Sequence, residues 1–408
     1  MFMISYKRKR THLKELENRE SSRLEMIAHA MPFNIRLGKQ NFVLGISVVF
    51  LVGFTLSLLE RVKRNKTNVE QGRCWELNML FQEKNLSGII HFQKTDSEKE
   101  KIHMINNWKL QETEMRIMEH LLLAQECRWE LNPIAVAQFR TQLQQCCNAS
   151  FRFVTTKENI RLGSYIIFDG NPTRKLRVDT KLLDLLPEKS PFMDTSYRKC
   201  AVVGNGGILL NSSCGQEIDR ADLVIRFNLP PMNFSEDIGT KTSLVTINPS
   251  ILQNRFKLLQ ERRKPFVEAL HSYSDATFLL PVLSFVGHNI LGYRVLYTLE
   301  DFGVEQQAFF LNPQYLSNLA NFWKKRGLKT NRLSSGFMLV SMALEFCQHI
   351  TLYGFWPFSY DLNNQSIPHH YYDNMMPTPG VHAMPTEFSY YLSMYAEGVL
   401  RLRVGKCQ

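Results

Sequence analysis

An apolar stretch without a charged residue occupies positions 42–59, where the sequence reads FVLGISVVFLVGFTLSLL. As a helix its 18 residues reach about 27 Å, enough to cross the hydrocarbon core of a bilayer. A helix in a soluble core normally keeps a polar stripe, and this stretch has none. Because 41 residues precede it and no small-x-small site follows closely, the pattern argues against a cleaved signal peptide. It predicts one uncleaved transmembrane anchor.

The chain after the anchor divides into a polar part and a globular part. Residues 60–126 are rich in Lys, Glu and Gln and poor in long apolar runs, which is typical of a stem, although apolar residues recur at helical spacing over 115–124. From 127 the composition is globular, and 127–147 reads as an amphipathic helix bordered by cysteines. The predicted parts are a tail (1–41), the anchor (42–59), a stem (60–126) and a globular domain (127–408).

Two later stretches alternate short apolar strands with helices. In 199–228, KCAVVGNGGILLNSSCGQEIDRADLVIRFN, a strand at 201–203 runs into a glycine turn, a helix follows, and 223–227 forms a second strand. In 332–358, RLSSGFMLVSMALEFCQHITLYGFWPF, a helix precedes a strand at 350–353. Strands that alternate with helices favour an α/β domain with a largely parallel sheet.

Both stretches place small residues where a helix begins. The GNGG turn at 204–207 lets the backbone approach a ligand closely, and Ser334, Ser335 and Gly336 open a helix whose N-terminus favours phosphate. Each feature alone is ordinary, as fold punctuation or as an N-cap. Two of them at strand ends in one α/β domain favour a nucleotide site. Leu209 occupies the last glycine position of the G-x-G-x-x-G fingerprint, which argues against a dehydrogenase.

The C-terminal region gathers histidine, acidic and aromatic side chains, with HHYYDN at 369–374 and HAMPTE at 382–387. A histidine that titrates near neutrality is the usual general base, although a hydrogen-bonded core residue is the simpler interpretation of any one of them. A metal site is a further alternative. The H-E-x-x-H pattern and an Asp-x-Asp pair are both missing from the sequence, and a nucleotide with a single phosphate needs no such pair.

The formal net charge of +11 raises the question of nucleic-acid binding. Residues 1–41 hold nine Lys and Arg against four Glu, so the tail alone carries about +5 and the remaining about +6 is spread over the rest of the chain. This dispersed charge argues against nucleic acid and is compatible with anionic substrates or acidic lipid.

Sequons and cysteines both lie on one side of the anchor. All eight cysteines follow it, and an even number in this setting favours disulfides over a metal site. Lys and Arg near the membrane are almost balanced, so the sequons decide the orientation. The N-terminus is therefore predicted in the cytosol and the globular domain in the lumen. Six Asn-x-Ser/Thr sequons follow the anchor and none precedes it: Asn65, Asn85, Asn148, Asn211, Asn233 and Asn364.

Four motifs in a fixed order resemble those of one enzyme family. In the first stretch, CAVVGNGGIL with the later NLPP resembles the large sialylmotif of the animal sialyltransferases. LSSG in the second stretch resembles their small sialylmotif, where many members have LSTG. HHYYDN is similar to their third motif and HAMPTE to their very small motif. The resemblance covers roughly residues 127–407 and points to the α-2,8 group.

This resemblance implies a modified Rossmann-like α/β/α sandwich, a variant of the GT-A glycosyltransferase fold, behind the transmembrane helix and stem. It implies an inverting α-2,8-sialyltransferase that uses CMP-sialic acid, no metal and no cofactor. His382 would deprotonate the acceptor hydroxyl on one face of the sugar while phosphate leaves from the other. The residues implied in contact with CMP-sialic acid are Asn205, Asn228, Ser334, Ser335, Gly336, Trp356, His369 and His370.

The family pattern also implies two long-range disulfides, each closing a loop of well over a hundred residues and stabilising by about 2–5 kcal/mol. The implied pairs are Cys200 with Cys347 and Cys214 with Cys407. The partners of the other four cysteines stay open: Cys146 and Cys147 are candidates for Cys127, and a local or an interchain bond is the candidate for Cys74.

Two departures mark an outlying member: Phe227 stands where many α-2,8 members have cysteine, and Ser335 replaces threonine but keeps the hydroxyl. The alternatives are an α-2,3 or α-2,6 enzyme and an inactive sugar-binding relative. The expected partners are a sialylated glycolipid or glycoprotein acceptor and the membrane, without nucleic acid, and a homodimer is compatible with the resemblance. The expected location is the Golgi membrane, as a single-pass type II protein with its catalytic domain in the lumen.

Overall fold

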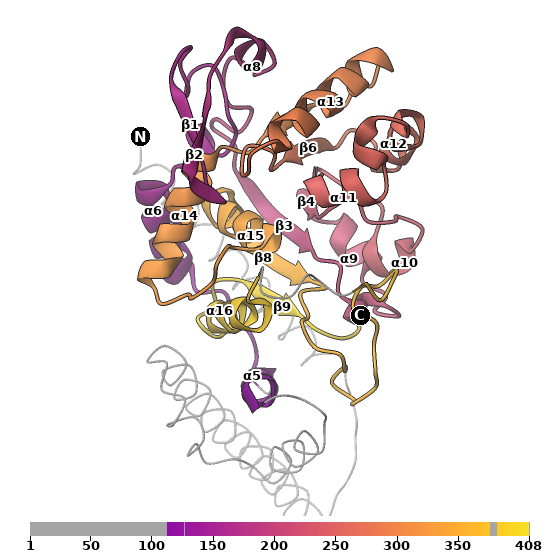
Figure 1. Ribbon diagram of the computed structural model, residues 1–408. Coiled ribbons are helices and arrows are strands. Elements are labelled where there is room, and N and C mark those ends of the chain that lie inside the picture. The colour runs from indigo at the N-terminus through magenta and orange to yellow at the C-terminus, as the bar shows by residue number, and fades with distance from the viewer. Residues whose placement is uncertain (1–111, 126, 376–381, 408) are drawn as a thin grey trace, which may run out of the picture. The chain divides into compact units, whose positions relative to one another are not determined.

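The computed structural model describes residues 112–125, 127–375 and 382–407 (Figure 1). All of these residues belong to one compact unit of the chain. The expected tail and anchor and most of the stem lie outside the described residues, so they stay predictions. Within the described ranges, no helix has the length and apolar character needed to cross a membrane.

A seven-stranded sheet forms the centre of this unit. Its strand order is β7-β6-β5-β4-β3-β8-β9, and every neighbouring pair is parallel. The predicted α/β domain with a parallel sheet is thereby confirmed. The strands are β3 (Tyr197–Val203), β4 (Leu223–Arg226), β5 (Leu244–Thr246), β6 (Thr277–Leu280), β7 (Ala308–Phe310), β8 (Cys347–Tyr353) and β9 (Arg401–Arg403).

Helices cover both faces of the sheet, which explains why its strands are continuous apolar runs rather than alternating ones. Along β4 every residue is buried: Ile225 points into the core on one face and Val224 into the core on the other. The first face carries α5 (Glu112–Gln125), α6 (Pro133–Cys146), α7 (Ala149–Arg152), α14 (Pro313–Lys325), α15 (Ser335–Phe346) and α16 (Met384–Ala396). The opposite face carries α9 (Gly215–Asp219), α10 (Ser235–Ile238), α11 (Pro249–Asn254), α12 (Arg263–Leu270) and α13 (His288–Asp301).

The order of the strands reverses between β3 and β8. From β3 the chain proceeds through β4, β5, β6 and β7 to one edge, whereas β8 and β9 lie on the other side of β3. In open parallel sheets, ligands bind beyond the carboxyl ends of the strands at such a switch point. Gly204 and Gly354 directly follow β3 and β8. The glycine turn found in the sequence therefore lies where this topology favours a ligand.

Two helices differ from expectation. The helix expected over 127–147 begins only at Pro133, because Asn132 caps it and proline suits a first helical turn. The helix expected after the glycine turn is reduced to a short 3₁₀ turn and the five-residue α9. Asn211 and Ser213 adopt φ of 59° and 53° between these pieces, and such left-handed residues interrupt a helix.

A separate antiparallel hairpin, absent from the sequence-based expectations, joins β1 (Tyr165–Phe168) to β2 (Asn171–Arg177) and leads into α8 (Thr180–Asp184) (Figure 1). Its inner residue Ile166 packs in the same core as Leu291 and Val295 of α13. Ile166 thus attaches the hairpin to the core on the face of the sheet that carries α11, α12 and α13.

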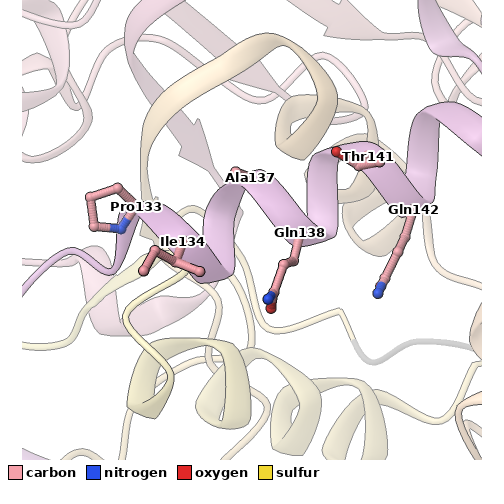
Figure 2. Close-up of a pocket in the computed structure, with 6 residues that line it drawn as sticks. All are labelled: Pro133, Ile134, Ala137, Gln138, Thr141 and Gln142. Atoms are coloured by element: carbon pink, nitrogen blue, oxygen red, sulfur yellow. The ribbon is translucent and has the colours of Figure 1, made fainter.

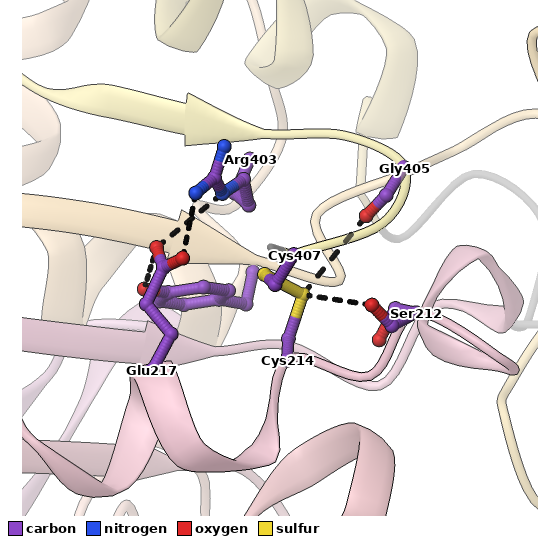
Figure 3. A network of polar contacts seen from close by, with 7 residues as sticks. Ser212, Cys214, Glu217, Arg403, Gly405 and Cys407 are labelled. Atoms are coloured by element: carbon purple, nitrogen blue, oxygen red, sulfur yellow. Dashed lines mark hydrogen bonds and ion pairs between the residues drawn. A yellow bond between two sulfur atoms is a disulfide. The ribbon is translucent and has the colours of Figure 1, made fainter.

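Disulfides tie the sheet to the end of the chain. Cys200–Cys347 joins β3 to β8, and Cys214–Cys407 holds the C-terminal segment against the start of α9, beside the Glu217–Arg403 ion pair (Figure 3). Both implied pairs are confirmed. The expectation that Cys127 pairs with one of the two cysteines that end α6 is wrong, because Cys146 and Cys147 bond to each other.

Candidate functional site

The glycine turn after β3 packs directly against the loop after β8. The N–H of Gly204 donates to Tyr353 O at 2.7 Å, and the N–H of Gly206 donates to Gly354 O at 2.9 Å. A Cβ atom at Gly206 would lie 2.6 Å from that carbonyl oxygen, so a larger residue does not fit. The turn is therefore glycine-rich because two loops meet there, and it carries Asn205 to the switch point.

Asparagine side chains follow β3, β4 and β5 and gather in one place. Asn205 Nδ2 donates to Phe227 O at 3.1 Å, and Asn228 Oδ1 accepts from the N–H of Asn248 at 3.3 Å. Asn248 Nδ2 in turn donates to Ser335 Oγ at 3.4 Å. The Oδ1 atoms of Asn205 and Asn248 are buried without a partner in the described chain. Buried polar atoms are normally paired, so these oxygens indicate a ligand that brings hydrogen-bond donors.

The start of α15 gives its two serines different roles. Ser334 is buried, its N–H donates to Glu387 Oε1 at 2.8 Å, and its hydroxyl donates to Glu387 Oε2. Its Oγ also accepts from Phe337 N at 3.1 Å, so Ser334 is an N-cap that is fully engaged within the protein. The N–H groups of the half-buried Ser335 and Gly336 have no partner among the described residues. An anion can bind them.

The glycine turn and the start of α15 are neighbours through the ring of Phe355. This ring lies 3.3 Å from the Cβ position at Gly204 and 3.0 Å from the one at Gly336. Together with the Asn248–Ser335 contact, this places the residues expected to bind the donor, Asn205, Asn228, Ser335 and Gly336, around one point beyond the strand ends.

His382 is bound to the backbone just before α15. Its Nδ1 lies 3.1 Å from Arg332 O, and because a carbonyl only accepts, Nδ1 carries the proton and Nε2 keeps its lone pair. Burial lowers the pKa of His382, the bond to the Arg332 carbonyl opposes this, and the charge of Arg332 lowers the pKa further. The imidazole is thus neutral at pH 7 and suited to act as a general base.

A hollow of about 540 Å³ opens beside this imidazole. Basic, polar and apolar residues line it, from the end of α14, the loop after it and the two residues before α16. The lining residues are His382, Ala383, Lys324, Leu328, Lys329, Thr330 and Asn331. A second hollow, of about 500 Å³, runs along α6 and contains none of the expected site residues (Figure 2).

The segment 369–374 lies over the glycine turn. The N–H of Gly207 donates to His369 O at 3.2 Å, and the Nδ1 of His370 lies 2.7 Å from Asp373 Oδ1. Burial opposes ionisation of Asp373, but hydrogen bonds from His370 and the backbone keep its pKa below the usual value. The pKa of His369 is lowered by burial and then by the neighbouring His370. Both histidines therefore adjoin the turn that carries Asn205.

Trp356 lies beneath the turn rather than beside it. The residue is 6% exposed, its Nε1 donates to Tyr360 O at 2.9 Å, and its ring packs edge-on against Phe358 and Phe388. The side chain supports the turn from the core, and its expected contact with the donor stays a prediction.

Comparison with known proteins decides the family. Residues 154–399, more than half of the chain, match the family model for glycosyltransferase family 29 (sialyltransferase). The chain belongs to this family. The sialyltransferase is 44% identical over 283 residues to the alpha-N-acetylneuraminide alpha-2,8-sialyltransferase of Xenopus laevis, across 69% of this chain and 79% of the relative. It is 42% identical over 286 residues to alpha-2,8-sialyltransferase 8F of Homo sapiens, across 70% and 72%.

A longer alignment and a solved structure complete the comparison. The sialyltransferase is 35% identical over 362 residues to alpha-2,8-sialyltransferase 8E of Rattus norvegicus, across 88% of this chain and 94% of the relative. The crystal structure of a mammalian sialyltransferase aligns at 19% identity with a TM-score of 0.38, across 74% of this chain and 88% of that chain.

Sequence reasoning on this sialyltransferase missed Asn248. A signal was present, because Asn248 follows a short apolar strand and precedes Pro249 at the first turn of α11. Asn205 and Asn228 occupy similar positions after β3 and β4. The carboxyl ends of parallel strands share one edge of the sheet, so the third asparagine could have been added to the site.

Four of the expected sequon asparagines fall in the described ranges, and all four are exposed: Asn148, Asn211, Asn233 and Asn364. Asn65 and Asn85 lie outside those ranges. Among the described residues, His, Cys, Asp and Glu form no group of three or more that could hold a metal ion. Independence from metal stays a prediction of the resemblance.

Proposed function

We propose that this sialyltransferase transfers sialic acid from CMP-sialic acid to a hydroxyl of a terminal sialic acid, in α-2,8 linkage. The names of its relatives, at 35–44% identity, support the linkage. The observation that carries the proposal is the neutral imidazole of His382, bound to Arg332 just before α15. Among the described residues, neither its Nε2 nor the first N–H groups of α15 have a partner. A base and an anion site are thereby held together.

The donor fits the strand ends by its chemistry. We assign the fold to a Rossmann-like variant of the GT-A α/β/α sandwich. The N–H groups of Ser335 and Gly336, at the positive end of α15, would bind the phosphate or carboxylate of CMP-sialic acid. The unpartnered carbonyl oxygens of Asn205 and Asn248 would accept from donor hydroxyl or amino groups. Asn228 holds Asn248 in place, because the side-chain oxygen of Asn228 accepts a hydrogen bond from the backbone N–H of Asn248.

The reaction requires attack on one face and departure from the other. The acceptor hydroxyl oxygen forms a bond to C2 of the donor sugar while its proton passes to Nε2 of His382. The bond between C2 and the phosphate oxygen breaks, and CMP leaves with the electron pair. His370 pairs with Asp373 through Nδ1 and adjoins the glycine turn at Gly206, and we assign it to the stabilisation of the departing phosphate. Inversion at C2 follows.

The linkage is tested with the full-length enzyme in detergent, CMP-sialic acid, and matched acceptors that differ only in a terminal sialic acid. We expect product on the sialylated acceptor alone, with linkage read by permethylation and mass spectrometry, and equal yield in EDTA. Product on the asialo acceptor alone would indicate an α-2,3 or α-2,6 enzyme. CMP binding without product on either acceptor would indicate an inactive relative, and loss of product in EDTA would contradict metal independence.

The role of His382 is tested by His382→Ala. General-base catalysis contributes about 100- to 10,000-fold, so we expect kcat to fall by that factor while CMP affinity stays within about 2-fold. CMP affinity is measured by calorimetry on the same preparation. Loss of CMP binding together with a lowered unfolding midpoint would mean that the histidine is structural.

We also propose that the enzyme is a single-pass type II protein of the Golgi membrane with its catalytic domain in the lumen. The four exposed sequons and the disulfides of the described chain support an oxidising, glycosylating compartment. Treating the protein from intact microsomes with a glycosidase tests the topology. An unchanged electrophoretic mobility would contradict it.

A further inference from the structure

An ion pair lies near enough to the proposed catalytic histidine for its positive charge to lower the pKa of His382. At the tip of the β1–β2 hairpin, Asp169 Oδ2 lies 3.3 Å from Nη2 of Arg332. Ser284 Oγ accepts from the same nitrogen at 2.8 Å, and the guanidinium lies over the ring of Phe285, 4.8 Å from its centroid. Arg332 is the residue whose carbonyl holds His382. Arg332 thus contacts Asp169 through its side chain and His382 through its backbone carbonyl.

The hairpin tip that supplies Asp169 packs closely against Ser284 and Phe285. The N–H of Gly170 donates to Ser284 O at 3.0 Å, and a Cβ atom at Gly170 would lie 2.3 Å from the ring of Phe285. The side chain of Asp169 is 6% exposed. Burial raises the pKa of Asp169, while the charge of Arg332 and a hydrogen bond from Ser284 oppose the rise. Asp169 is therefore a positioning residue for the guanidinium.

The guanidinium keeps donors that the protein does not use. Only Nη2 is engaged, while Nε and Nη1 have no partner among the described residues. Neither atom is among the buried polar atoms that lack a partner, and the side chain is 20% exposed, so both reach solvent. The other titratable groups around it are His288 and His382, whose pKa values burial lowers first and the charge of Arg332 lowers further. Asp169 is thus the one anion facing this cation in the described chain.

We infer that Arg332 binds the carboxylate of the acceptor's terminal sialic acid, with Asp169 holding the guanidinium in position. The inference rests on the proposed function. An acceptor for α-2,8 transfer carries its nucleophilic hydroxyl and a carboxylate on the same sugar, whereas a galactose acceptor carries no charge. A guanidinium with free N–H groups is the usual partner of a carboxylate. Anchored there, the acceptor presents its hydroxyl to His382.

The experiment removes the charge from each partner in turn. Wild-type enzyme is assayed with a sialylated acceptor and with the same acceptor after methyl esterification of its carboxyl group. We expect kcat/KM to fall about 10- to 100-fold on esterification, the range for a charge-assisted contact. The double variant Asp169→Asn/Arg332→Gln leaves no unpaired buried charge. Its kcat/KM for the native acceptor should fall by a similar factor. The ratio of kcat/KM for the native acceptor to kcat/KM for the methyl ester should therefore approach one.

Controls separate recognition from structure. Lys325→Gln removes one exposed positive charge at the end of α14, outside the hollow beside His382, and we expect it to keep the wild-type preference. CMP affinity and the unfolding midpoint should be unchanged in all variants. Arg332→Lys keeps the positive charge, so it should retain part of the preference for the native acceptor over its ester that the double variant loses. Complete loss of that preference in Arg332→Lys would count against recognition by charge.

Failure of this inference differs from failure of the proposed function. If wild-type enzyme makes no product on any sialylated acceptor, the proposed α-2,8 activity fails. If wild-type enzyme makes that product but the double variant discriminates against the ester as strongly as wild type does, the role of Arg332 is overturned and α-2,8 transfer stands.

Discussion

Replacing Glu387 by glutamine should change how the stability of the protein depends on pH. Glu387 is 1% exposed, and burial raises its pKa from 4.5 to about 7, against the two hydrogen bonds from Ser334. Below pH 4.5 the carboxyl is protonated in both folded and unfolded chains, so its contribution to stability is complete. As pH rises, the unfolded chain ionises first, and the contribution is lost by about pH 7.

The magnitude follows from the two pKa values. A difference between 4.5 and about 7 corresponds to about 3 kcal/mol in total, of which about 2.5 kcal/mol falls between pH 5 and pH 8. Glutamine resembles the protonated carboxyl and does not titrate. The free energy of unfolding of wild type, minus that of Glu387→Gln, should therefore fall by about 2.5 kcal/mol over this interval.

Urea unfolding at pH 5, 6, 7 and 8, followed by tryptophan fluorescence with the disulfides intact, measures this difference. Burial also raises the pKa of Glu345 to about 7. Glu345 is present in both proteins, so its contribution to the pH dependence cancels in the difference. Glu236→Gln, which removes an exposed carboxylate from α10, controls for the loss of a surface charge. If the wild-type and Glu387→Gln curves run parallel from pH 5 to pH 8, the raised pKa is refuted.

Three further predictions concern the site. Asn248→Ala should weaken CMP binding about 10-fold, because it removes the buried, unpartnered amide oxygen that we assign to the donor, and unchanged affinity by calorimetry would contradict that role. Gly206→Ala brings a Cβ to 2.6 Å from Gly354 O and should lower stability by about 1–3 kcal/mol, with an unchanged denaturation midpoint as the opposing result. Because the pKa of His382 is lowered, the acid limb of kcat/KM against pH should lie below 6.5, and a limb at higher pH would argue against this base.

The parallel sheet and the ligand-binding turns at its strand ends could be predicted from the sequence, because their signals are local. Short apolar runs followed by GNGG or LSSG identify strands and helix starts from residues adjacent in the chain. It did not reveal the β1–β2 hairpin, whose outer strand residues Tyr165 and Ile167 are exposed and apolar, so the alternation that marks a half-buried strand is lost. The short length of α9 was also not predicted. The left-handed residues Asn211 and Ser213 interrupt the helix that was expected there.

For the site, residue types were predictable and their partners were not. The motifs supplied Ser334 and Ser335 together, but only tertiary contacts separate them, since Glu387 occupies the first and Asn248 contacts the second. The burial of Trp356 could not be predicted, because nothing adjacent to it in the chain indicates that Phe388 of α16 packs against its ring. Contacts between residues far apart in sequence decide whether a conspicuous side chain faces a ligand or the core.

Two hydrogen-bonded attachments join the residues that open α15 to the segment 382–387. They imply that the base, His382, and the proposed donor site at the start of α15 move together. Arg332 O holds His382, and two residues later Ser334 holds Glu387, so the segment 382–387 is bound to the residues that open the anion site. Glu387→Ala breaks the second attachment and leaves the buried N–H of Ser334 unpaired, which should cost about 1–3 kcal/mol of stability.

Because the first attachment and the N–H groups of α15 remain, CMP affinity should fall by less than about 3-fold in Glu387→Ala. Positioning of the imidazole should suffer more, since misplacement by about 1 Å can cost about 100-fold in rate. Stopped assays for kcat and calorimetry for CMP separate the two effects. Equal losses in kcat and CMP affinity would mean that Glu387 supports only the donor site, and that the base is held by its own bond to Arg332 alone.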